Sequence, residues 1–163
     1  MRTQGRRSSR RDAPLSPDAF ATVLSKKEFT NGADSGTVIN LYRNTATALL
    51  GSTKELRYKE LKWSDAQFER LGEALCYCGA LETLEVKEME LSDTAAAAVV
   101  AGLASCTSLK TLKLFNCSSL TALPDLSALA DLKVEYLPSH LTPWEAGGFK
   151  AWDFIADGWP RDS

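Results

Sequence analysis

Hydrophobic and polar residues alternate in several short segments of the chain. Leu84-x-Val86 shows this pattern clearly, and alternation with period two is typical of a β-strand with one buried face. Leucines begin the segments at Leu56, Leu84 and Leu112, each 28 residues after the last. A regular spacing of this size indicates an internal repeat of a small structural unit.

Each full unit changes from strand spacing to helix spacing partway through. Residues 56–83 align without gaps on residues 84–111, and Ser64-Asp65 falls on Ser92-Asp93 as a helix start. Ser64 and Gln67 also have the spacing of a capping box. The apolar positions of the helical parts are Phe68, Leu71 and Leu75, then Ala96, Val99 and Leu103. A strand–loop–helix unit with one apolar side needs a stacked neighbour to close its core.

A third copy opens at residues 112–117 and is shortened. The next strand-like segment, residues 132–137, follows after 20 residues instead of 28. Placing Leu132 on Leu112 predicts a fourth strand in the same sheet.

The region before the repeats predicts helices. Ser16-Pro17 is a typical helix start, with serine at the N-cap and proline at the first helical position. Residues 37–50 have helix-like spacing, with apolar residues Val38, Leu41, Ala48 and Leu49. A stack of units exposes its core at each end. We therefore expect residues 16–52 to form a helical N-terminal cap.

The charge is unevenly spread along the 163 residues, whose formal net charge is −2. Residues 1–11 hold five arginines and no acid, so a basic segment precedes a more acidic body. Residues 1–15 have little to bury and predict a disordered arm. The arm has three interpretations: a solvated tail, an organelle targeting signal, or a contact with the nucleus or an anionic surface. Ser9 follows arginines as basic-directed kinase sites do.

Compartment follows from what the sequence lacks. The chain has no apolar run long enough to span a membrane and no secretory signal. We therefore expect a cytoplasmic protein with reduced thiols, with the nucleus or an organelle as the alternative.

The strand motif resembles the leucine-rich repeat superfamily. Leu109-Lys-Thr-Leu112-Lys-Leu114-Phe-Asn-Cys117 fits the pattern L-x-x-L-x-L-x-x-[N/C], and the spacing of 28 resembles the ribonuclease-inhibitor-like class. The resemblance covers residues 53–137, about half of the chain. It implies an α/β solenoid with a parallel concave sheet, a helical convex side, and protein binding on the concave face. Leu61 and Met89 depart from the usual Asn/Cys position.

The outward strand positions are the candidate partner-binding residues. If Leu84 and Val86 face the core, their polar neighbours face outward on the concave sheet. The expected columns are Glu55, Thr83, Thr111 and Asp131; Arg57, Glu85, Lys113 and Lys133; and Lys59, Lys87, Phe115 and Glu135. Phe115 and Tyr136 are the apolar exceptions and the candidate anchors. Because both signs of charge appear, we do not expect nucleic acid on this face.

Enzyme chemistry has little support in the sequence, and we expect no catalytic residue, cofactor or metal. The single histidine, His140, has no nucleophile beside it. Cys76-x-Cys78 has no second pair at metal-ligand spacing. Cys78 and Cys106 occupy equivalent places in the repeat, where a small buried residue is expected.

The final segment, residues 138–163, is rich in aromatic residues. These are Trp144, Phe149, Trp152, Phe154 and Trp159. We expect them to cap the open end of the solenoid, with a partner-docking patch as the alternative. The sequence as a whole predicts a protein-interaction module, an adaptor or regulatory protein. The alternative is an inhibitor or accessory subunit that covers an enzyme's site. Weak self-association through an open end is a further expectation.

Overall fold

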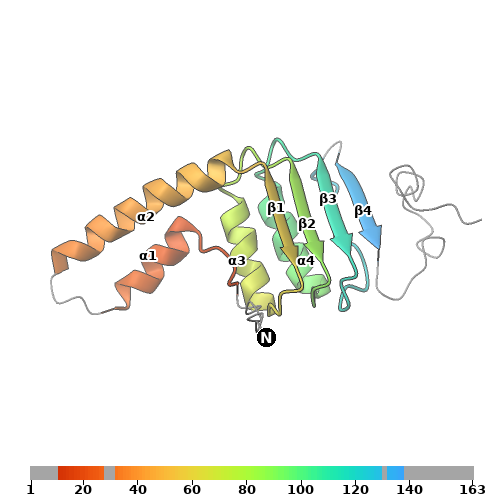
Figure 1. Cartoon of the computed structure of the whole chain (residues 1–163), viewed down its shortest axis with the longest axis horizontal. Coiled ribbons are helices and arrows are strands. Elements are labelled where there is room, and N and C mark those ends of the chain that lie inside the picture. Colours follow the sequence, from red (N-terminus) through yellow and green to blue (C-terminus); the bar gives the residue numbers. More distant parts are fainter. Residues whose placement is uncertain (1–10, 28–31, 130–131, 138–163) are drawn as a thin grey trace, which may run out of the picture.

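The computed structural model describes residues 11–27, 32–129 and 132–137, which form four α-helices and a four-stranded parallel sheet (Figure 1). The expected α/β class is therefore confirmed. The elements in chain order are α1 (Pro17–Ser25), α2 (Gly32–Ser52), β1 (Glu55–Lys59), α3 (Asp65–Leu75), β2 (Thr83–Lys87), α4 (Asp93–Leu103), β3 (Thr111–Phe115) and β4 (Lys133–Leu137).

The strands lie in sequence order, and their register follows the spacing of 28. Leu56 pairs with Leu84, and Leu84 pairs with Leu112. The prediction that these three leucines stand on adjacent parallel strands is confirmed. The register keeps their side chains on one face, where Leu84 is 0% and Leu112 1% exposed.

The predicted register of β4 is wrong by two residues. Leu112 pairs with Val134 instead of Leu132, and Lys113 pairs with Glu135. A shift of two residues leaves every side chain on its original face, so the alternation of residues 132–137 could not distinguish the two registers. The observed register sets opposite charges on neighbouring strands, whereas the predicted one would have set Lys113 opposite Lys133.

Helices α3 and α4 cover one face of the sheet (Figure 1). Leu71 and Leu75 of α3 and Leu103 of α4 are 0% exposed and share one hydrophobic core with the inward strand residues. The two helices approach closely at their glycines. A methyl group on Gly102 would collide with the backbone carbonyl of Gly72, so this contact requires the absence of a side chain.

Serine residues begin the helices as predicted. The Ser16 hydroxyl accepts a hydrogen bond from the Ala19 N–H (3.1 Å), and Ser92 does the same from Ala95 (3.1 Å). At α3, Gln67 Oε1 accepts from the Ser64 backbone N–H (3.0 Å), as the predicted capping box requires. These bonds satisfy donors that the first helical turn leaves unpaired.

The segment before α1 is packed where a disordered arm was expected. Ala13 is 6% exposed and belongs to the core. The Trp63 indole N–H donates to the Arg11 carbonyl (2.6 Å), and Gln67 donates to the Asp12 carboxylate (3.1 Å). The prediction of disorder is therefore wrong for residues 11–15, while residues 1–10 lie outside the described residues.

Helices α1 and α2 form a pair that extends beside the strand–helix body, which comprises residues 55–137 (Figure 1). The predicted helix over 37–50 is confirmed within α2, but its apolar residues do not cover the core. Leu41 and Leu49 are 67% and 64% exposed. Leu50 is the residue of α2 that packs against the core among the described residues. The expected C-terminal cap, residues 138–163, lies outside the described residues.

Candidate protein-binding face

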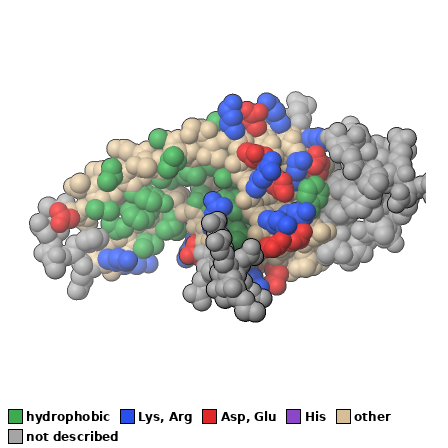
Figure 2. All heavy atoms as spheres, viewed as in Figure 1, with side chains coloured by type: hydrophobic (Ala, Val, Ile, Leu, Met, Phe, Trp, Pro, Cys, Tyr) green, Lys and Arg blue, Asp and Glu red, His purple; other side chains and the backbone are tan. Residues whose placement is uncertain are grey.

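The sheet has a second face over which no described helix or strand lies (Figure 1). Its side chains alternate with the buried ones, because successive residues of a strand point to opposite sides. Eleven described residues form this open face: Glu55, Arg57, Lys59, Thr83, Glu85, Lys87, Thr111, Lys113, Phe115, Lys133 and Glu135. Figure 2 shows basic and acidic side chains intermixed over the strands. The predicted columns are therefore confirmed for the described residues of β1, β2 and β3. At β4, each residue pairs with a neighbour two positions earlier on β3 than predicted.

The middle row of the open face alternates in charge across the sheet. Arg57, Glu85, Lys113 and Glu135 stand opposite one another on successive strands. Arg57 Nε lies 4.0 Å from Glu85, and Lys113 Nζ lies 2.9 Å from Glu135. Lys133 also contacts Glu135 at 3.2 Å. The row is a charge ladder whose members partly neutralise one another.

Glu135 is the most enclosed charged group of this ladder. Its side chain is 14% exposed. Partial burial raises the pKa of this carboxyl, but hydrogen bonds from Lys113 and Lys133 outweigh burial and hold it below its usual value. Glu135 therefore carries its charge at neutral pH, between two lysines.

The third row of the open face, Lys59, Lys87 and Phe115, lies at the ends of the strands, where its lysines contact glutamates. Lys59 lies 2.8 Å from Glu60 and 3.9 Å from Glu88, while Lys87 lies 3.6 Å from Glu88. The hydrogen bond between Lys59 and Glu60 raises the pKa of the lysine and lowers that of the glutamate. Glu60, Glu88 and Asn116, each directly after a strand, have positive φ values of 55°, 54° and 52°. The chain therefore makes the same left-handed turn after β1, β2 and β3.

The two aromatic candidates separate in the structure. Phe115 lies on the open face and is half-buried. Tyr136 pairs with Leu114, so it points inward, and it packs against the core. Burial raises its pKa. The prediction that Tyr136 lies on the open face is wrong, because Tyr136 alternates with Lys133 and Glu135 and falls on the inward phase of β4 in the predicted register as well as in the observed one.

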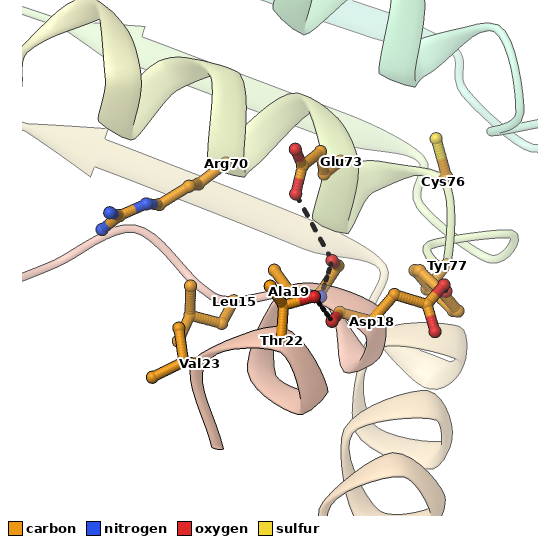
Figure 3. A pocket seen from close by; sticks show the side chains of 10 residues that line it. Leu15, Asp18, Ala19, Thr22, Val23, Arg70, Glu73, Cys76 and Tyr77 are labelled. Carbon is orange, nitrogen blue, oxygen red and sulfur yellow. Dashed lines mark hydrogen bonds between the residues drawn. The ribbon is translucent and has the colours of Figure 1, made fainter. Parts of the chain in front are cut away.

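A cavity of about 630 Å³ lies between α1 and α3, and the sequence did not predict it (Figure 3). Ser16 Oγ lies 3.5 Å from a Glu73 carboxylate oxygen, and the Tyr77 hydroxyl donates to Asp18 (2.9 Å). Asp18 also pairs with Arg43 of α2 (2.9 Å). These partners are far apart in sequence, and no local motif marks them. Polar bonds of this kind join α1 to the body and α2 to α1.

The four cysteines, all of them among the described residues, form no disulfide with one another. Cys78, Cys106 and Cys117 are buried and free, while Cys76 is exposed. Burial raises the pKa of Cys78 to about 11, of Cys106 to about 12 and of Cys117 to about 11, so these thiols stay protonated at neutral pH. The described residues hold no cluster of three metal-ligating side chains. His140 lies outside them.

Comparisons of the chain with protein-family models, curated proteins and solved structures find no match. Within the described residues, no helix has the length and apolar character needed to cross a bilayer.

Proposed function

We propose that this chain is a short solenoid of the leucine-rich-repeat type and that its open face binds another protein. The observation that carries the proposal is the stacked register. Strands 28 residues apart place Leu56, Leu84 and Leu112 in one row. The helices following β1 and β2 close the core behind that row. Such stacking leaves the other side of the sheet as a long, regular surface.

The chemistry of the open face supports protein as the ligand. Acidic and basic side chains alternate across the strands, which suits a partner with both signs of charge more than a polyanion. The half-buried ring of Phe115 stands at the end of β3, where it offers apolar area beside this polar ladder. Aromatic residues surrounded by polar groups are typical energetic centres of protein interfaces.

The test is affinity capture with the purified chain, followed by identification of the bound protein and measurement of its dissociation constant. Phe115→Ala is expected to weaken capture about tenfold, the size of a moderate hot spot. Arg57→Glu is expected to weaken it as well, because the substitution ends the alternation of charge at β1. Glu69→Lys on α3, a charge reversal on the helical side, is the matched control and is expected to have no effect.

The effects of these variants on capture distinguish binding by the open face from binding by the C-terminal segment. If neither face variant reduces capture while Trp152→Ala does, the partner binds the C-terminal segment and the proposal fails. Circular dichroism and thermal unfolding of each variant confirm that the loss concerns binding. Arg57 is suited to this purpose, because its side chain is 65% exposed and its replacement opens no cavity.

A further inference from the structure

Among the described residues, one side of helix α2 contacts other parts of the chain and another side is exposed. Tyr42 stacks on Phe20 with ring centroids 3.7 Å apart, and its hydroxyl donates to the Leu15 carbonyl (3.0 Å). Arg43 pairs with Asp18 (2.9 Å). These contacts define the inner side of the helix, which faces α1 and the segment before it.

The outer side carries an exposed, uncharged stripe. The α2 stripe consists of Val38, Leu41, Thr45, Ala48 and Leu49, all of them exposed. Their spacing places them on one side of a helix. Val38, Leu41 and Leu49 have exposed fractions of 39%, 67% and 64%. Figure 2 shows apolar side chains gathered over α1 and α2, in contrast to the charged sheet face.

We propose that the α2 stripe pairs with the α2 stripe of a second copy of this chain, in antiparallel orientation about a two-fold axis near Thr45. Leu41 and Leu49 lie four residues on either side of Thr45. Rotation about that axis therefore sets Leu41 of one copy against Leu49 of the other, twice. A surface that complements itself in this way is the requirement for a symmetric dimer.

The charges at the two ends of the stripe favour the antiparallel orientation. Asp34 lies in the first turn of α2, and Lys54 follows its last turn with a side chain that is 75% exposed and lies 3.6 Å from Glu82. Antiparallel pairing brings Asp34 of one copy toward Lys54 of the other and aligns the helix dipoles favourably. Parallel pairing would instead bring the two Asp34 carboxylates together.

The area of the stripe sets the strength of this contact. A helix of 21 residues is about 31 Å long, and a contact strip about 10 Å wide would bury roughly 300 Å² per copy. Stable interfaces bury about 1,000 Å² or more in total, so the dimer is expected to be weak and dependent on concentration.

Sedimentation equilibrium of the full chain, from micromolar to millimolar concentration, tests the proposal. The wild-type chain is expected to show a monomer–dimer equilibrium. L41E and L49K each place a charge against a leucine and are expected to weaken it at least about tenfold. Asn40→Glu, at an exposed position of the same helix that lies outside the stripe, is the matched control and is expected to leave the equilibrium unchanged.

Mixing the two variants tests the orientation. In the antiparallel dimer, L41E and L49K meet each other as an opposite-charge pair across the axis, so an equimolar mixture is expected to regain the dimer. A parallel pair would not regain it. A monomeric wild-type chain, a dimer that survives both single variants, or a mixture that stays monomeric would each overturn the proposal. Both leucines are largely exposed, so the variants are expected to fold.

Discussion

Helices α2 and α4 are both poor in charged residues, but their apolar side chains lie in different environments. Helix α4 buries Val99 and Leu103 between α3 and the sheet. Helix α2 leaves Leu41 and Leu49 in solvent. Both sequences have apolar residues at helical spacing, so the local pattern alone does not tell which helix joins a core. The neighbouring elements determine whether a helix joins a core, and the apolar residues of α4 share one with α3 and the strands.

The largest expected difference between these helices comes from removing a leucine. Leu103→Ala is expected to lower the free energy of unfolding by about 2–5 kcal/mol, because it leaves a cavity at a fully buried position. Leu41→Ala on α2 is expected to change it by less than about 0.5 kcal/mol, the usual range for surface positions. Urea unfolding followed by circular dichroism measures both. Equal losses would show that α2 is packed in solution.

A smaller difference is expected from adding a methyl group to a glycine in each helix. Gly102→Ala is expected to cost about 1–3 kcal/mol, because the new Cβ meets the Gly72 carbonyl and α4 must move away from α3. Gly36 in α2 has no atom within 4 Å of its would-be Cβ, so Gly36→Ala is expected to stabilise the chain by up to about 1 kcal/mol. Thermal unfolding of the two variants gives the signs. A stabilising Gly102→Ala would contradict the close contact of α3 and α4.

The places of β1, β2 and β3 could be predicted from sequence because leucines 28 residues apart mark them. Leu56, Leu84 and Leu112 each fall where the spacing of 28 places them, and the serines at the helix starts mark the change of element. The open face followed from the same phase. Its middle row was correct for the first three strands and wrong at β4, because a two-residue shift preserves the alternation of inward and outward positions. Only the pairing of opposite charges, Lys113 with Glu135, distinguishes the observed register from the predicted one.

Other features of the structure have no signal in the local sequence. The packing of Ala13 in the core depends on residues about 50 positions away, such as Trp63, which belongs to the same cluster. The positive φ of Glu60 and Glu88 was not expected, because glycine and asparagine are the usual residues there. Asn116 at the equivalent turn was the one residue whose type suits that conformation. The exposure of the α2 stripe could not be predicted either, since helical spacing describes a side of the helix and not its neighbour.

The smallest expected effect is a dependence of stability on acidic pH, and it tests how the loop after β3 is held to the start of α4. Asp93, at the start of α4, accepts hydrogen bonds from the Thr121 hydroxyl, the Thr121 N–H (2.8 Å) and the Ala122 N–H (3.3 Å). These bonds lower the pKa of Asp93, in that order of importance. A lowered pKa in the folded state means that the stabilisation is complete above the unfolded-state pKa of about 3.9 and disappears as the pH falls through the folded-state value.

The free energy of unfolding is therefore expected to differ between the wild-type chain and Asp93→Asn at pH 6, and this difference is expected to shrink below about pH 4. Thr121→Val keeps both backbone donors and removes the hydroxyl, so it is expected to show a smaller difference over the same pH range. Denaturant unfolding at intervals from pH 6 to pH 3 measures all three proteins. If the difference in the free energy of unfolding between wild type and Asp93→Asn stays constant across this range, the charge of Asp93 does not stabilise the loop. In that case, the shortened connection to β4 would be held by apolar contacts such as Leu120, which is 1% exposed.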